Sequence, residues 1–177
     1  ALINSVTART AGFSTYSLGE FSNAGLLAMI FLMFVGASPG STGGGIKTST
    51  LFALIQGIKT AATNTSGKAF HYSVPHGVFR KASVIAVMGI SVIAVGTFML
   101  CAFEPDIAIR DALFEMTSAF GTVGLTTGIT TGLCTASKLL SIVIMYIGRL
   151  GPLTIATLWY FTNGDRIKYP DGNIAIG

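Results

Sequence analysis

The stretch GASPGSTGGGIKT, Gly36 to Thr48, decides the fold because it breaks an apolar helix at membrane depth. It follows the run LLAMIFLMFV, Leu26 to Val35, whose ten residues are too few to cross a bilayer, which needs roughly 20. No charged residue occurs from Phe21 to Ile46, so the break itself lies in the apolar region. Irregular backbone survives there only where it is buried in protein or lines a water-filled cavity. The sequence therefore predicts one broken transmembrane helix whose loop is enclosed.

The composition indicates that the surrounding solvent is a lipid bilayer. Hydrophobic residues make up 51% of the chain and charged residues only 10%, whereas soluble domains carry roughly 25% charged residues. The net charge of +4 is attributed to cytoplasmic loops, because the basic residues do not cluster with aromatic residues as in nucleic-acid-binding proteins. We therefore expect a multi-pass protein of the cell membrane that binds no nucleic acid.

Processing signals and metal motifs are absent from the sequence pattern. The chain begins ALINSVTA, without an initiator Met or a basic n-region, so we expect a piece of a longer protein that carries no signal peptide. Cys101 and Cys134 have no metal-ligand spacing and imply no disulfide framework, and both are expected to be inert. His71 and His76 lack the Cys or carboxylate partners that a metal site needs.

One structural unit occurs twice. Shifting the sequence by 112 residues places Thr10-Ala-Gly-Phe-Ser-Thr on Thr122-Val-Gly-Leu-Thr-Thr, and the same shift pairs Gly36 with Gly148. The interval between the paired glycines is 24 residues in both copies. Each copy thus consists of a short Thr/Gly loop followed by an apolar helix, which indicates an internal repeat.

The second copy suggests how the loop is presented. Asp111 to Phe120 is about ten residues long, so as a helix it covers roughly 15 Å, half of a hydrocarbon core, and must re-enter. Its C-terminal dipole end favours cations, and the extended segment after it can offer backbone carbonyls in place of a hydration shell. The predicted filter, with a cation at its carbonyls, comprises Thr10, Ala11, Gly12, Phe13, Thr122, Val123, Gly124 and Leu125. A single glycine in each segment predicts a wider, less selective filter than one of the TVGYG type.

The remaining segments give a consistent topology. Ile46 to Ala61 continues the broken helix, and the loop Thr63 to Lys81 has three basic and no acidic residues, which makes it cytoplasmic by the positive-inside rule. Ala82 to Phe103 spans the membrane outward, and Leu139 to Phe161 spans it inward. The tail from Asn163 to Gly177 is again expected inside.

An acidic cluster precedes and begins the re-entrant helix. Glu104, Asp106, Asp111 and Glu115 lie on the predicted outer side. They could concentrate cations at an outer mouth, or Asp111 and Glu115 could merely begin the half-helix and pair along it. The sequence leaves these two interpretations equally supported.

Arg149 is the only charge in the last span and is its eleventh residue, near the bilayer centre. An arginine at that depth must face protein or water, and the repeat places it level with Ala37. We expect Arg149 to hydrogen-bond loop carbonyls or to stand in the pore as a positive barrier; a purely structural pairing is the alternative. The predicted intramembrane loop comprises Gly36, Ala37, Ser38, Pro39, Gly40, Ser41, Thr42, Gly43, Gly44 and Gly45, and Lys47 follows it.

The motifs resemble those of the Ktr/Trk/HKT superfamily of potassium transporters. The resemblance rests on SPGSTGGGIKT from Ser38, TARTAGFST from Thr7, FEMTSAFGTVGLTTG from Phe114, IGRLGPLT from Ile147 and the ending YPDGNIAIG, and it covers essentially the whole chain. It implies an all-α membrane protein of tandem helix–pore-loop–helix repeats, with re-entrant pore loops and one broken transmembrane helix.

The resemblance also assigns parts and partners. Gly12 and Gly124 become glycines of a potassium filter, Gly36 to Gly45 an intramembrane gating loop, and Arg149 and Lys47 residues associated with that gate. A homodimer and a cytosolic nucleotide-binding regulatory ring of the RCK type are implied, so that nucleotide acts only through that partner, with sodium as a second ion. Two of four filter segments are missing, so the piece alone should not conduct. The predicted regions are a third repeat (1–62), a cytoplasmic loop (63–81), a fourth repeat (82–162) and a cytoplasmic tail (163–177).

Two other function classes are considered. A P-loop enzyme requires G-x-x-x-x-G-K-[ST], but Ile46 intervenes between Gly45 and Lys47, which displaces the lysine from a phosphate. A sodium-coupled carrier with a midplane site also uses broken helices. The repeat here is parallel, with both loops entering from outside, and this favours a channel-like path for potassium.

Overall fold

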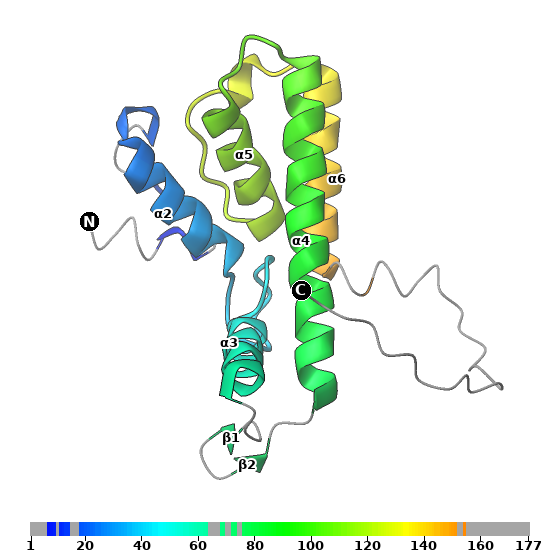
Figure 1. The fold of residues 1–177 in the computed structure, drawn as a ribbon. Helices are drawn as coiled ribbons and strands as arrows, with labels where there is room; N and C mark the ends of the chain where they lie inside the picture. The colour runs from blue at the N-terminus through cyan, green and yellow to red at the C-terminus, as the bar shows by residue number, and fades with distance from the viewer. Residues whose placement is uncertain are drawn as a thin grey trace, which may run out of the picture.

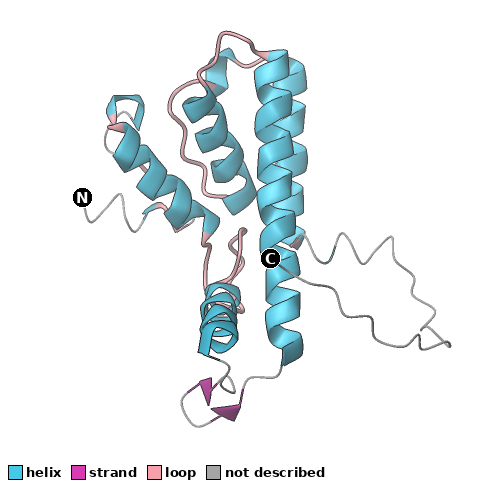
Figure 2. Ribbon diagram, in the orientation of Figure 1, coloured by secondary structure: helices cyan, strands magenta, loops and turns pink. Residues whose placement is uncertain are grey.

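The computed structural model describes residues 7–9, 11–14, 18–63, 68–69, 72–73, 76–151 and 154. The described chain is helical apart from one small hairpin (Figures 1 and 2). Its elements are η1 (Leu18–Glu20), α2 (Asn23–Phe34), α3 (Thr48–Thr63), β1 (Lys68–Ala69), β2 (Tyr72–Ser73), α4 (His76–Phe103), α5 (Ile109–Gly121), η2 (Thr130–Gly132) and α6 (Thr135–Leu150). The expected all-α fold class is therefore confirmed as a mostly helical fold, while the tandem repeats and the pore loops stay predictions.

Helix α5 is the centre of the molecule. It lies between α2 on one side and the paired α4 and α6 on the other (Figure 1). Every residue from Phe114 to Gly121 is buried, although α5 is only 13 residues long. Phe120 and Met116 pack with Leu100 of α4 and Ile144 of α6, while Phe114 packs with the apolar face of α2. A short helix whose last eight residues are all buried is held by its neighbours and not by its own propensity.

The contact between α5 and α6 requires a glycine. A Cβ atom added to Gly148 would stand 1.9 Å from the carbonyl oxygen of Phe120, the penultimate residue of α5. No side chain fits such a distance, so the glycine allows α6 to touch the C-terminal end of α5. This contact fixes where the chain that leaves α5 begins.

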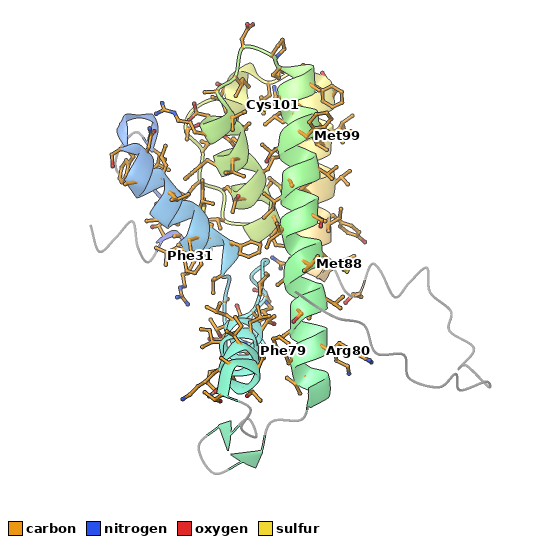
Figure 3. The ribbon with its side chains drawn as sticks, viewed as in Figure 1. Phe31, Phe79, Arg80, Met88, Met99 and Cys101 are labelled. Carbon is orange, nitrogen blue, oxygen red and sulfur yellow. The ribbon has the colours of Figure 1, made fainter. Side chains whose placement is uncertain are left out.

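The break in the apolar helix occurs where the sequence predicts it. Helix α2 ends at Phe34 and α3 begins at Thr48, below α2 in Figure 1. Helix α4, expected from Ala82, begins earlier, at His76. The extra turns are stabilised by Phe79, which points toward α3 and lies over Gly57, whereas Arg80 points away from α3 (Figure 3).

Helix α4 is the element suited to a bilayer. In the described part of the chain, Gly77–Phe103 is the one helix that is long and apolar enough to span a membrane. Large apolar side chains of α4 and α6 are exposed, for example Phe98 (75%) and Tyr146 (65%). Helix α6 begins at Thr135 instead of Leu139, and most of the expected span beyond Gly151, with the tail 163–177, lies outside the described residues.

Candidate functional site

The chain turns sharply where α5 ends. Thr122 caps the helix in the left-handed region (φ 52°, ψ 40°), and its N–H donates to the carbonyls of Ser118 and Ala119. The next residues run without regular structure as far as Thr126, with Val123 and Leu125 buried and Gly124 exposed between them. This alternation is typical of an extended segment with one face against the protein.

A second segment, residues 11–14, lies beside this one. Gly12 and Gly124 both have positive φ, +73° and +87°, a region that glycine adopts without steric cost. A Cβ atom on Gly12 would stand 2.6 Å from the carbonyl oxygen of Val123, and one on Gly124 would stand 3.9 Å from Cα of Gly12. The structure thus brings together Gly12, Val123 and Gly124, while Thr10 lies outside the described residues. Ala11 and Phe13 are exposed.

The elements that follow the two segments match at the same spacing. The 3-10 helices η1 and η2 begin at Leu18 and Thr130, and α2 and α6 begin at Asn23 and Thr135, so each pair is 112 residues apart. The residue before α2 and the residue before α6 also act alike. At the start of α2, Ser22 Oγ accepts a hydrogen bond from Gly25 N–H.

Cys134 caps α6. Its sulfur accepts from the N–H of Ser137 at 3.5 Å, in the position that Ser22 occupies on α2. The sequence predicts an inert cysteine, and the structure gives Cys134 this capping role instead. The signal was available, since the repeat aligns Cys134 with a serine, a preferred N-cap residue.

The loop between α2 and α3 is pinned at its base. Gly36 N–H donates to the carbonyl of Ile46 (2.8 Å), and Ile46 N–H donates to the carbonyl of Phe34 (3.0 Å). The Lys47 ammonium closes the loop from inside by donating to the carbonyls of Ser41 (3.0 Å) and Gly43 (2.5 Å). Lys47 is therefore a structural member of the loop, and it contributes a positive charge there.

The tip of the loop touches the chain that leaves α5. The N–H of Gly44 donates to Thr122 Oγ1 at 2.9 Å, across 78 residues of sequence. Residues 43–46 are buried, whereas residues 38–42 are exposed. The loop rises between α2 and α3 toward the lower end of α5 (Figure 1). One hydrogen bond thus joins the loop to the first residue of the predicted filter, a link that the sequence pattern does not predict.

Arg149 lies in the last turn of α6, one residue after the glycine that contacts Phe120. A Cβ atom on Gly44 would stand 2.9 Å from that same Phe120 carbonyl oxygen, so α6 and the loop meet at the end of α5. The Arg149 side chain is exposed and makes no hydrogen bond to a described residue. Its predicted contact with the loop carbonyls stays a prediction.

The acidic cluster divides into parts with different environments. Glu115 is buried (8% exposed), and its Oε1 accepts from the hydroxyls of Thr126 and Thr130, the latter at 2.9 Å. It lies behind the segment after Gly124 and not in an open mouth. The sequence signal for this contact is a glutamate within an apolar half-helix, with Thr126 and Thr130 in the segment that follows.

Glu104 supports the N-terminal end of α6. Its Oε1 accepts from Cys134 N–H at 2.6 Å and from Ser137 Oγ at 3.4 Å. The Cys134 backbone N–H holds the pKa of the Glu104 carboxyl below its ordinary value. Asp111, in contrast, pairs with Arg110 at 3.6 Å. Glu104 thus holds the start of α6, Glu115 holds the segment after Gly124, and Asp111 pairs with its neighbour in the first turn of α5. The role of these residues in concentrating cations stays a prediction.

Comparison with known proteins gives a family and several relatives. Residues 1–167 match the family described as "TrkH: Cation transport protein". The chain is 36% identical over 173 residues to "Ktr system potassium uptake protein B" of Bacillus subtilis, a match covering 97% of this chain and 39% of that protein. It is 37% identical over 180 residues to "Potassium/sodium uptake protein NtpJ" of Enterococcus hirae, covering 98% and 40%. The chain thus spans about two fifths of the length of these relatives.

A solved structure has the same fold. The chain is similar to the crystal structure of the potassium transporter TrkH from Vibrio parahaemolyticus, with a TM-score of 0.72. The match covers 88% of this chain and 35% of that chain at 22% sequence identity. At that identity the likeness concerns the arrangement of the helices alone.

Proposed function

This chain belongs to the TrkH family of cation transport proteins, and from that premise we propose that it forms the filter and the gate of a potassium-translocating membrane subunit. The observation that carries the proposal is the contact of three parts: the two glycine segments lie side by side, and the loop donates a hydrogen bond to Thr122, the first residue of the segment that contains Gly124. Family and relatives are ion transporters and not enzymes. The P-loop alternative is also disfavoured because the Lys47 ammonium is engaged by its own loop.

Two copies of one unit build the path. The shared 112-residue spacing of η1 with η2 and of α2 with α6 supports tandem helix–pore-loop–helix repeats. The positive φ of both filter glycines supports a common backbone turn in both copies. In this scheme potassium is held by backbone carbonyls of residues 10–13 and 122–125, with equivalent segments supplied by the remainder of the longer protein.

The loop Gly36 to Gly45 acts as the gate. It enters below the filter because α2 stops at Phe34. The backbone hydrogen bonds of Ile46 with Gly36 and Phe34, and the bond from Gly44 to Thr122, keep it in place. Opening requires that the hydrogen bond from Gly44 to Thr122 breaks while α5 remains buried. Arg149 carries positive charge next to this junction and raises the barrier for a cation that rests there.

The names of the relatives support proposals about the partners and the ions of this protein. A potassium uptake system with a "protein B" supports a membrane subunit that works with other subunits, and we propose a homodimer regulated by a cytosolic RCK-type ring. The name "Potassium/sodium uptake protein" of the Enterococcus hirae relative supports sodium as a stimulating or second ion. The location is the cell membrane, with several passes.

Uptake of rubidium by the complete protein in a cell deficient in potassium uptake tests the proposal. Gly124→Ser is expected to weaken apparent potassium affinity or selectivity, and deletion of residues 43–45 is expected to raise flux. Arg149→Gln is expected to change flux more than the amount of inserted protein. If normally inserted variants transport like wild type, the glycine segments are scaffold. Flux that couples stoichiometrically to sodium would instead favour the carrier with a midplane site.

A further inference from the structure

The second predicted filter segment, residues 122–125, is attached to α5 at both ends. At its start, the N–H of Val123 donates to the carbonyl of Ser118 at 3.0 Å. Just beyond its end, the hydroxyl of Thr126 donates to Oε1 of Glu115, which lies in the middle of α5. Glu115 is buried, with 8% of its surface exposed. Two points of one helix therefore hold the segment between them.

A network of hydroxyls strengthens the second attachment. Thr130 Oγ1 lies 2.9 Å from Glu115 Oε1 and 2.7 Å from Thr126 Oγ1. Thr126 Oγ1 also accepts from the N–H of Gly128 at 2.9 Å, and Gly128 has a φ of +104°, which glycine adopts without steric cost. Because a buried carboxylate is costly unless it is hydrogen-bonded, Glu115 keeps these hydroxyls in place. One oxygen atom thus fixes the turn that begins two residues after Gly124.

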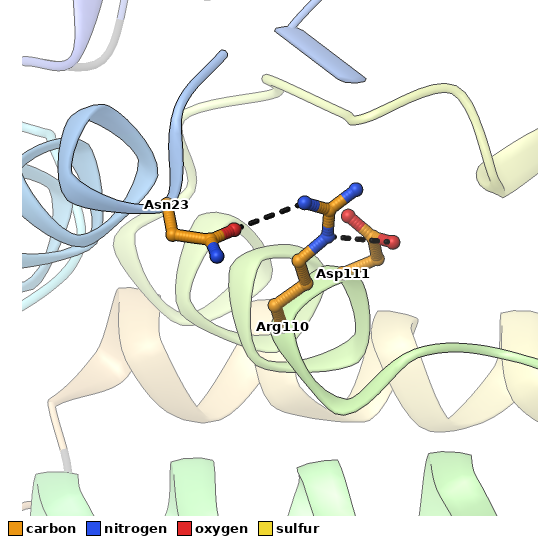
Figure 4. A network of polar contacts seen from close by, with 3 residues as sticks. All are labelled: Asn23, Arg110 and Asp111. Atoms are coloured by element: carbon orange, nitrogen blue, oxygen red, sulfur yellow. Dashed lines mark hydrogen bonds and ion pairs between the residues drawn. The ribbon is translucent and has the colours of Figure 1, made fainter. Parts of the chain in front are cut away.

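Helix α5 is itself fixed where it begins. Arg110 Nη1 donates to Oδ1 of Asn23 in α2 at 3.0 Å, and Arg110 Nε lies 3.6 Å from Asp111 Oδ2. Figure 4 shows Arg110 between these two partners. The other carboxylate of α5, that of Asp111, is therefore paired with its neighbour, and its Oδ1 has no hydrogen-bond partner among the described residues. Glu115 is thus the carboxylate of α5 that holds the filter segment.

The first copy of the repeat has different residues at these places. The 112-residue shift sets Ile3 at the position of Glu115 and Leu18 at that of Thr130. Leu18 begins η1 as Thr130 begins η2, but Leu18 is buried (2% exposed) in the apolar cluster that contains Leu26, whereas Thr130 is exposed. The same unit thus forms with an apolar residue at this place. The fold alone does not require the hydroxyl and its buried carboxylate.

We propose that Glu115 is a positioning residue that sets the preference of the filter for potassium over sodium. A segment attached at one end only can close around the smaller sodium ion. A segment attached at both ends keeps its carbonyls at the spacing that replaces the hydration shell of potassium. Glu115 supplies the second attachment through Thr126 and touches no ion itself. The inference rests on the proposed filter and names the residue that gives it selectivity.

Competition against rubidium uptake by the full-length protein in proteoliposomes tests the inference. The double variant Glu115→Ile, Thr130→Leu gives the second copy the residues of the first. Its ratio of the sodium to the potassium concentration that halves uptake should fall about tenfold, which corresponds to about 1.4 kcal/mol, the free energy of one hydrogen bond. The maximal rate should change less than this ratio. Glu115→Gln keeps one acceptor oxygen and should retain part of the preference, and Asp111→Asn, the matched control on the same helix, should have the wild-type ratio.

Several results would overturn the inference. A wild-type ratio in the double variant would show that the attachment does not affect selectivity. An equal fall in Glu115→Gln and the double variant, or the same fall in Asp111→Asn, would assign the effect to negative charge instead of position. If the double variant is not inserted, Thr126→Val removes the hydroxyl alone and should show the same tenfold fall; an unchanged ratio would be decisive against the inference. Wild-type uptake is measured first, so that a failure of the transport proposal is seen separately.

Discussion

The hydrogen bond between Gly44 of the gate loop and Thr122, the first residue of the predicted filter segment, gives a sharp prediction. Thr122→Val removes the oxygen that accepts from Gly44 N–H and keeps nearly the same shape, including the branch at Cβ. Gly44 is buried, so in the closed arrangement its N–H would lose its partner without gaining water. An unsatisfied buried donor costs about 1–3 kcal/mol. This cost applies only to the closed arrangement, because an opened loop can hydrate its N–H groups.

The closed state of the gate should be destabilised by that amount. A coupling of about 1–3 kcal/mol corresponds to a 5- to 150-fold change in the ratio of closed to open gates. We therefore expect Thr122→Val to raise rubidium flux in proteoliposomes that contain the full-length protein without its regulatory partner. The increase should lie within that range wherever opening limits flux, and the ratio of potassium to sodium permeability should stay unchanged.

Thr122→Ser is the matched control, because it keeps the hydroxyl and loses only the methyl group. It should transport within about twofold of wild type, given the usual scatter of such effects. The reasoning is refuted if the valine variant, present in normal amount, has the flux of the serine variant. A lower flux in the valine variant would also refute it, since the hydroxyl would then serve the conducting state.

Three further predictions concern the supports of the site. Glu115→Ala removes the acceptor of two threonine hydroxyls and should lower the preference for potassium over sodium in competition uptake. Glu115→Gln keeps one acceptor oxygen and should retain part of that preference. Equal selectivity in the wild type and both variants would show that Glu115 does not support the filter. Gly148→Ala should destabilise the protein by about 1–3 kcal/mol or more through its clash with the Phe120 carbonyl, seen as a lower melting temperature, whereas Gly132→Ala, with open space around it, should melt like wild type. The pKa of Glu104 is lowered in the folded protein, so the stability that its bond to the start of α6 contributes is fully present above the ordinary carboxyl pKa and is lost as pH falls through the folded pKa. Glu104→Gln should therefore reduce the fall in melting temperature between pH 7 and acid pH. An equal fall in the variant and the wild type would contradict this role.

Periodicity and charge were enough to locate the main elements. The break after Phe34, the short half-helix and the long apolar α4 each depend on local pattern and on the length that a bilayer demands. The family, its helical fold and its non-enzymatic character, inferred from motifs, are confirmed by the comparisons. Element boundaries were less certain, because packing such as that of Phe79 on α3 extends a helix beyond its apolar run.

The candidate site was predicted as two separate loops, and the sequence could not say what touches what. The 112-residue repeat suggested that Gly12 and Gly124 are equivalent, but equivalence does not establish adjacency. The roles of Glu115 and Cys134 depend on which face of a helix is buried, and that is set by neighbours far away in sequence. The contact of Arg149 with the gate loop remains a prediction.

The sequence by itself determined that apolar helices are interrupted by glycine-rich segments, because hydrophobicity, charge and backbone freedom are local properties of the chain. Only the tertiary structure decided that the tip of one segment bonds to Thr122 at the start of the other, 78 residues away. A buried N–H must find an acceptor, but which acceptor it finds depends on how α5, α6 and the loop converge at the Phe120 carbonyl. That convergence is a packing solution that no single stretch of sequence specifies.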